Sequence, residues 1–248
     1  MVSLARCVLV LQIGTSGWVY RHWMNRFYPA SLAGEQQLPF YAQHFSTVEI
    51  NFSFYRLPER STFETWRSQT PDRFLFAVKG SRYLTHMKKL KDPEEPLARL
   101  MKRASGLQAK LGPILFQFPR QWSANCDRLQ SFLELLQTYP NQRYTFEFRH
   151  PSWLASPVYR LLEHTGAALC LPISPDVPLD LHLTAPWTYF RMHQGQSGVA
   201  YSEAELVHWA GEIRSFLSQN IDVYVYFNND PDGHAIDNAK RLSDLLNR

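Results

Sequence analysis

The stretch RYTFEFRHPSW, residues 143–153, has the pattern of a β-strand that ends in two opposite charges. Side chains alternate between the two faces of a strand, so Phe146 and Phe148 share one face, and Glu147 and Arg149 share the other. A proline follows Arg149 closely and favours the end of the strand there. The pattern predicts a strand whose aromatic face packs into a core and whose two charged side chains point into one space.

Apolar runs of similar length recur along the chain, and each is bounded by polar residues or by turn-forming residues. Counting the one in the quoted stretch, the sequence contains eight candidate strands. They are residues 8–14, 47–52, 74–79, 114–118, 143–148, 167–171, 188–193 and 222–228.

The segments between the strands show apolar residues at a period of 3.6, which is typical of helices that bury one face. This periodicity is clear in residues 97–107, 129–136, 206–217 and 236–246, whereas residues 172–186 contain four prolines and predict an irregular connection. Strands that alternate with helices predict a parallel sheet. The turn GTSGW after the first strand lacks the glycine-rich phosphate signature of an open doubly wound sheet. The sequence therefore predicts an α/β protein that is a single (β/α)8 barrel of the TIM type over residues 1–248, with an irregular sixth connection.

Composition limits the classes of protein that the chain can represent. Of its 248 residues, 45% are hydrophobic, and the formal net charge of +4 permits an anionic ligand without requiring one. The apolar run near the N-terminus is too short for a membrane span. Cys7, Cys126 and Cys170 show no CxxC spacing, so we expect free thiols in a reducing compartment. We expect a cytoplasmic protein with no membrane partner.

Polar side chains stand at the C-terminal ends of six of the predicted strands. In a closed barrel these ends converge on one mouth, where barrel enzymes keep their active sites. Charges there are costly unless they are paired or used. We therefore predict a ligand site at the mouth. Its candidate residues are Glu49, Asn51, Lys79, Gln117, Glu147, Arg149, Arg191, His193, Asn228, Asn229 and Asp230.

Eight stretches in the same order along the chain carry a resemblance to a known family. They are GTSGWVYRHW (14–23), FYP (27–29), VEINFSFYRLP (48–58), FAVKGSRYLTH (76–86), LGPILFQFP (111–119), FEFRHPSW (146–153), YFRMH (189–193) and YVYFNND (224–230). Together they resemble the family known as domain of unknown function 72, or YecE-like proteins. The resemblance implies a TIM-type barrel and implies no reaction, because that family has no agreed activity. Relatives carry Arg-x-His-Gly after the seventh strand, whereas here Gln194 separates His193 from Gly195, which leaves the position of His193 open.

Anion binding is the first chemistry that the candidate residues suggest. Arg149 and Arg191 offer planar forks for a phosphate or carboxylate. Lys79 begins a loop, residues 79–91, that also contains Arg82 and has no acidic residue. We expect these side chains to bind substrate at the mouth.

Acid–base or nucleophilic catalysis is the second possibility. Glu147 lies beside Arg149 and should stay ionised, whereas Glu49 has only Asn51 nearby in sequence and is expected to be the protonated member of the pair. His193 and Lys79 complete the candidate catalytic set. A lysine at the end of a barrel strand would also suit a Schiff base.

Two further interpretations rest on weaker patterns. Stacking on a sugar or a base would suit the aromatic residues Tyr55 and Trp153, together with Trp18, Tyr20, Trp23 and Phe54.

A divalent metal would suit the set Glu49, Glu147, His193 and Asp230, although no spaced motif supports one. We expect no metal to be needed for folding and leave any cofactor unknown.

These observations favour an enzyme that acts on a small anionic or phosphorylated substrate, although the sequence does not establish catalysis. One alternative is a nucleic-acid-binding protein or a metal-dependent nuclease that resembles barrels of the endonuclease IV type. The modest net charge disfavours that alternative. A non-catalytic scaffold is a further alternative. The substrate, the reaction and the oligomeric state stay open.

Overall fold

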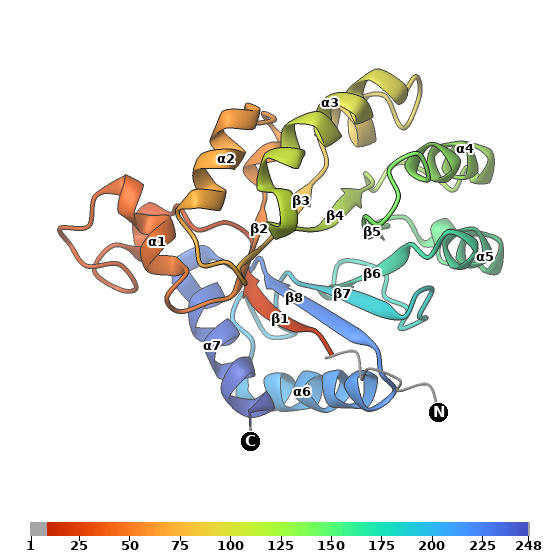
Figure 1. The fold of residues 1–248 in the computed structure, drawn as a ribbon. Helices are drawn as coiled ribbons and strands as arrows, with labels where there is room; N and C mark the ends of the chain where they lie inside the picture. Colours follow the sequence, from red (N-terminus) through yellow and green to blue (C-terminus); the bar gives the residue numbers. More distant parts are fainter. Residues whose placement is uncertain (1–8, 248) are drawn as a thin grey trace, which may run out of the picture.

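The computed structural model describes residues 9–247, in which eight parallel strands form one sheet (Figure 1). Neighbouring strands follow the order β1-β8-β7-β6-β5-β4-β3-β2. Cys7 and the first residue of the expected first strand lie outside the described residues. The strands are β1 Leu11–Thr15, β2 Thr47–Ile50, β3 Leu75–Lys79, β4 Leu111–Gln117, β5 Tyr144–Glu147, β6 Ala168–Ile173, β7 Trp187–Met192 and β8 Asp222–Phe227.

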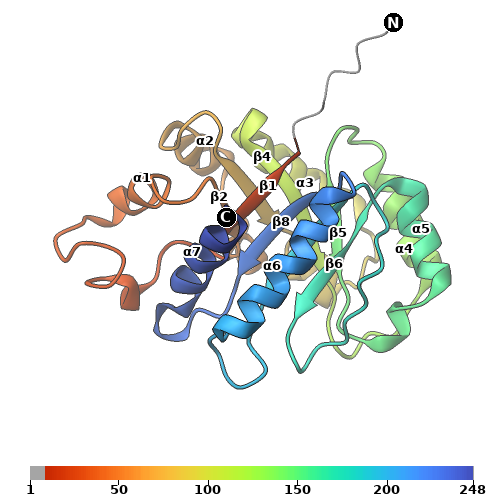
Figure 2. The same cartoon turned by 90° about the horizontal axis from the view of Figure 1, so that it is seen from below.

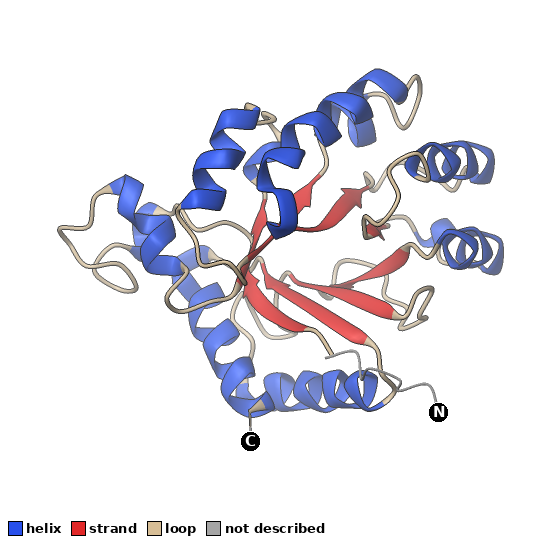
Figure 3. Ribbon diagram, viewed as in Figure 1, coloured by secondary structure: helices blue, strands red, loops and turns tan. Residues whose placement is uncertain are grey.

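The helices lie outside the strands in all views (Figures 1, 2 and 3). Between α5 and α6 the described chain connects β6 to β7 without a helix, as the proline-rich sixth connection predicted. Of the described helices, none is long and apolar enough to cross a membrane. The helices are α1 Gln37–Tyr41, α2 Arg60–Ser68, α3 Glu94–Ala104, α4 Cys126–Leu136, α5 Ser156–Thr165, α6 Glu203–Ser218 and α7 His234–Leu246.

Local signals in the sequence set several helix ends. Ser202 and Glu205 form a reciprocal capping box at the start of α6, and the Asn125 side chain accepts from the Arg128 N–H at the start of α4. Gly166 ends α5 in the left-handed region at φ 68°. At these three ends the helix boundary coincides with a capping residue.

The barrel closes between β1 and β2, where the described residues form fewer backbone contacts than a regular β-ladder has. These backbone contacts are an isolated bridge between Ser16 and Glu49 and a 2.8 Å hydrogen bond from the Gly17 N–H to the Glu49 carbonyl. A Cβ atom on Gly14 would lie 2.2 Å from the Thr47 carbonyl oxygen. The absence of a side chain at Gly14 lets the two strands approach closely at this seam.

The strands bury both of their faces. Outward-facing residues form the large core under the helices, where Phe146 packs on Phe116, Phe118 and Phe132. Inward-facing residues, including Trp187, Tyr189, Tyr224 and Tyr226, fill the barrel below the mouth. The alternation predicted for the fifth strand is confirmed, because Phe146 and Phe148 belong to the outer core while Glu147 belongs to the interior.

Candidate functional site

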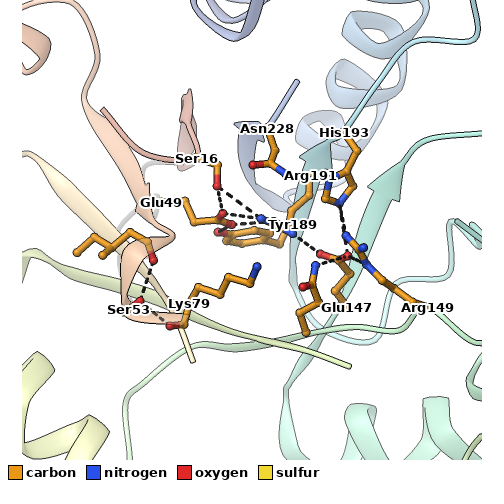
Figure 4. Close-up of polar contacts among 12 residues, drawn as sticks. Ser16, Glu49, Ser53, Lys79, Glu147, Arg149, Tyr189, Arg191, His193 and Asn228 are labelled. Atoms are coloured by element: carbon orange, nitrogen blue, oxygen red, sulfur yellow. Dashed lines mark hydrogen bonds and ion pairs between the residues drawn. The ribbon is translucent and has the colours of Figure 1, made fainter. Parts of the chain in front are cut away.

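Five strands place polar side chains together at the C-terminal mouth (Figure 4). Glu49, Lys79, Gln117 and Glu147 lie near the ends of β2, β3, β4 and β5, and Arg191 lies on β7. Gln117 and Glu147 are register partners on adjacent strands. The location expected from strand ends is therefore the location in the structure.

Arg191 is the centre of this group and is fully buried. Its Nε and Nη2 donate to the two oxygens of Glu49 at 2.9 and 2.7 Å, and its Nη1 donates to Glu147 Oε2 at 2.6 Å. Three of its nitrogens are thus bound to carboxylates that are also fully buried. Arg191 has no exposed surface for a ligand. The expected substrate contact at this residue is therefore wrong, and its side chain instead forms ion pairs with the two carboxylates.

Glu49 accepts hydrogen bonds on both oxygens. Ser16 and Arg191 donate to Oε1, and Tyr189 donates to Oε2 at 2.8 Å. Burial alone would raise the pKa of Glu49, but the Arg191 guanidinium outweighs it and the pKa is lowered from its ordinary value. The expectation of a protonated Glu49 is therefore wrong, because its main partner comes from β7 and lies far away in sequence.

Glu147 is held on the opposite side of Arg191. Its Oε1 accepts from Gln117 Nε2 at 2.8 Å and from Arg149 Nε at 2.7 Å. Burial opposes ionisation, but the charge of Arg191, supported by His193 and Arg149, lowers the pKa of Glu147 well below its ordinary value. The prediction that Arg149 keeps Glu147 ionised is consistent with this, although Arg191 makes the larger contribution.

His193 joins the outer part of the network despite the additional residue Gln194. Its Nε2 lies 3.4 Å from Glu147 Oε1, and its Nδ1 lies 3.1 Å from Asn228 Nδ2. The same Nε2 lies 3.4 Å from Arg149 Nη2, so the ring stands between the Arg149 guanidinium and the Asn228 side chain. Burial lowers the pKa of His193 against the opposing effect of Glu147, so the ring is neutral at pH 7.

Lys79 differs from the other charged residues at the mouth. Its side chain is 5% exposed and extends toward the space between Glu49 and Glu147 (Figure 4). Among residues 9–247, no carboxylate oxygen lies within 4.0 Å of its Nζ, and its ammonium instead sits over the Phe54 ring at 4.1 Å from the ring centre. Burial and the charge of Arg191 lower the pKa of Lys79 to about 7, against the opposing charges of Glu49 and Glu147.

The surroundings of the network also favour negative charge. Burial lowers the pKa of His86, which follows β3, to about 4, with further contributions from Lys79, Arg149 and Arg82. Arg149 is 23% exposed, and its Nε is taken by Glu147 while its Nη1 makes no contact with another described residue. The mouth thus combines two satisfied carboxylates with cationic groups that keep free N–H donors.

Some sequence-predicted residues lie away from this network. Trp153 is fully buried, stacks on Phe148 and donates its indole N–H to the Trp122 carbonyl, so the expected ligand contact there is corrected to core packing. Asp230 accepts from Trp23 Nε1 at 2.7 Å, and Asn229 donates to the Asn238 side chain at 2.8 Å. Both of these residues hold the β8 end against neighbouring loops.

Asn51, Tyr55 and Arg82 lie on the loops around the mouth. Tyr55 is 68% exposed and, with Asn51, lines an apolar cavity of about 440 Å³ between the loops that follow β1 and β2. The Asn51 Oδ1 is buried there without a hydrogen-bond partner. Trp23 is fully buried and Phe54 nearly so, so most of the expected stacking residues pack inside the protein.

The four residues considered as metal ligands, Glu49, Glu147, His193 and Asp230, do not form one cluster. Within the described part of the chain, no three His, Cys, Asp or Glu side chains are close enough to hold one metal ion. Asp230 faces Trp23 and His22, and Glu49 is saturated by Arg191, Ser16 and Tyr189. Glu49 and Glu147 are therefore members of an ion-pair network, and Asp230 lies apart from it.

Sequence reasoning missed three contributors to the site. Tyr189 precedes Arg191 by two residues on β7, so strand alternation could have placed both inside the barrel. Ser16 lies in the turn after β1, and only the closure of the barrel brings it to Glu49. Phe54 was identified as an aromatic residue near the mouth but not as the partner of Lys79.

The fold and site define a TIM-barrel protein with a buried ion-pair network at its C-terminal mouth. The chain belongs to the family described as protein of unknown function DUF72, whose model matches residues 12–248. It is 26% identical to the UPF0759 protein YunF of Bacillus subtilis, over 96% of this chain and 95% of the relative. It is 28% identical to the UPF0759 protein YecE of Escherichia coli K12, over 59% of this chain and 51% of that relative.

Solved structures show the same architecture. A DUF72 family protein from Thermotoga maritima aligns with a TM-score of 0.84 at 29% identity, covering 96% of this chain and all of that one. A DUF72 family protein from Enterococcus faecalis aligns with a TM-score of 0.79 at 18% identity over 96% of this chain and 95% of its own. The second likeness is evidence for the fold alone.

Proposed function

We propose that the protein is an enzyme that binds a small anionic or phosphorylated substrate at the barrel mouth. The observation that carries this proposal is the unpaired Lys79, beside a network whose own charges are already balanced. The carboxylates of Glu49 and Glu147 are matched by the guanidiniums of Arg191 and Arg149. A protonated Lys79 therefore adds a positive charge that a substrate anion would neutralise.

Arg149 and Lys79 are the groups that contact the anion in this proposal. Glu147 fixes the Arg149 guanidinium through Nε, and Nη2 lies 3.4 Å from His193 Nε2. Among the described residues Nη1 has no hydrogen-bond partner, so it is the donor left for a carboxylate or a phosphate. Arg191 contributes indirectly, because it keeps Glu147 ionised and in place. The anion-binding role first expected of Arg191 thus belongs to Arg149 and Lys79.

Lys79 is also the candidate acid–base group. A pKa of about 7 lets one side chain accept or donate a proton near neutral pH. Glu49 and Glu147 have lowered pKa values and four and three close donors respectively, so they act as positioning residues rather than as acids. His193 stands at the edge of the network, where both of its ring nitrogens have polar partners.

The test compares melting temperatures in phosphate and chloride at equal ionic strength. Phosphate should stabilise the wild-type protein more than chloride does, because only a bound ligand shifts the folding equilibrium by mass action. Arg149→Met should remove this difference, whereas Arg160→Met on the exposed face of α5 should leave it unchanged. Equal phosphate responses in wild type and Arg149→Met would reject the proposed site.

A further inference from the structure

We infer that Lys79 is a nucleophile that forms an imine with an aldehyde or ketone bearing an anionic group. This inference rests on the proposed function and names its substrate class: Arg149 binds the anionic group while Lys79 attacks the carbonyl carbon. The argument begins with how the Lys79 amine is placed in the barrel.

The backbone of Lys79 is fixed while its amine is left untied. The Ser53 hydroxyl donates to the Lys79 carbonyl at 2.6 Å, and the next residue, Gly80, donates to the Leu115 carbonyl at 2.8 Å. The Nζ, in contrast, has the face of Phe54 as its described contact. An amine held in position without hydrogen bonds to break is suited to attack a bound carbonyl.

The chain provides its own comparison in Lys110, which is also buried, at 7% exposed. Its Nζ donates to the Arg67 carbonyl at 2.7 Å, to the Thr70 carbonyl at 2.6 Å and to the Thr70 hydroxyl at 3.3 Å. All three protons of that ammonium are used in structural hydrogen bonds. Lys79 lacks such partners, so a structural role does not account for its burial.

The charges around Lys79 favour a reactive amine and then an iminium ion. Burial and the positive charges of Arg191 and Arg149 lower the pKa of Lys79 to about 7, which leaves much of the amine unprotonated at neutral pH. The carboxylates of Glu49 and Glu147 oppose this effect. They would also stabilise the positive charge of the protonated imine, as would the Phe54 ring.

The proposed step balances in atoms and charge. The Lys79 amine adds to the carbonyl carbon, and the oxygen leaves as water after taking two protons from the nitrogen, one directly and one by way of solvent. The overall change is R₂C=O plus Lys–NH₃⁺ to Lys–NH⁺=CR₂ plus H₂O. No oxidant, reductant or metal is consumed.

Reductive trapping tests the inference on the wild-type protein. The protein is incubated with pyruvate or dihydroxyacetone phosphate and cyanoborohydride at neutral pH, and labelled lysines are identified by peptide mass mapping. We expect Lys79 to be labelled at least about tenfold faster than the exposed Lys91 in the same sample. Labelling of Lys79 no faster than Lys91 would overturn the inference.

Variants and a neutral probe test the two halves of the inference. Lys79→Arg keeps the charge and should abolish the fast labelling, while leaving that of Lys91 unchanged. Arg149→Met removes one of the charges that lower the pKa of Lys79, so it should slow labelling by both probes, but it should slow labelling by pyruvate about tenfold or more beyond its effect on labelling by acetone. Equal effects on both probes would overturn the assignment of Arg149 to the anionic group.

The phosphate experiment separates the two proposals. Phosphate stabilisation that depends on Arg149, without fast labelling of Lys79, would overturn the imine and keep the anion site. Fast labelling of Lys79 without any effect of phosphate would reject the anion site and restrict the inference to neutral carbonyl compounds.

Discussion

Arg191 is central to the mouth because its single guanidinium forms ion pairs with two buried carboxylates. It contacts Glu49 through two nitrogens and Glu147 through a third, all within 2.9 Å. The sequence could identify the charges at strand ends but not this pairing, because Glu49 and Arg191 are separated by 142 positions. The protonation state of Glu49 depends on that long-range contact and was therefore predicted wrongly.

Replacing Arg191 should cost far more than replacing a surface arginine. We expect Arg191→Met to lower the free energy of unfolding by about 3–5 kcal/mol at neutral pH, since it leaves the buried Glu49 without its ion-pair partner and Glu147 with Arg149 alone. Arg241→Met, which breaks an exposed ion pair with Glu203, should cost much less because solvent screens that pair. Urea denaturation measures both values.

The loss of unfolding free energy caused by Arg191→Met should be smaller in mild acid than at neutral pH. In the wild type the pKa values of both carboxyls are lowered, so their stabilisation is present above the unfolded pKa and is lost as pH falls through the folded one. In the variant, less positive charge opposes the effect of burial, so these carboxyls take up protons at a higher pH than in the wild type, which removes uncompensated charge. A cost that grows toward acid would contradict this assignment of charges.

Lys79 should make the free energy of unfolding of the wild type depend on pH between about 7 and about 9. Its folded pKa of about 7 lies below the unfolded value of 10.5, so the unfolded chain binds the additional proton between these pH values. The free energy of unfolding of the wild type should therefore rise relative to that of Lys79→Met as pH increases from about 7 to about 9. Parallel curves for the two proteins would show that Lys79 has an ordinary pKa.

Among the elements, the strands were predicted more accurately than the positions of loop residues. All eight predicted strands overlap the observed ones, since alternation and apolar runs are local signals. Loop residues follow no such period. Trp153 lies in a short 3₁₀ helix that turns it into the core, and Asp230 begins another that directs it to Trp23. Tertiary packing decided both orientations.

The seam between β1 and β2 should be sensitive to a single methyl group. Gly14→Ala should lower the free energy of unfolding by about 1–3 kcal/mol, because the added Cβ would overlap the Thr47 carbonyl. Gly211→Ala in α6 is the matched control. A Cβ there meets open space, and alanine favours a helix, so this variant should gain up to about 1 kcal/mol. A Gly14→Ala variant as stable as the wild type would show that the seam tolerates a side chain.

For the whole molecule, the barrel topology explains why distant residues form one site. The C-terminal ends of parallel strands meet at one mouth, so residues 49, 79, 147 and 191 converge without any local motif. The sequence could therefore predict the place of the site. The identity of the residues that face a ligand depends on which charges neutralise each other, and only the assembled barrel determines that.

The central claim is that this mouth binds a small anion through Arg149 and Lys79. Its most direct test is a crystal of the wild-type protein soaked in selenate, a tetrahedral dianion that selenium reveals by anomalous scattering. The account predicts a selenium peak at the mouth, with oxygens within hydrogen-bond distance of the Arg149 guanidinium and the Lys79 ammonium. Selenate bound only at other surfaces, with water alone at the mouth, would contradict it.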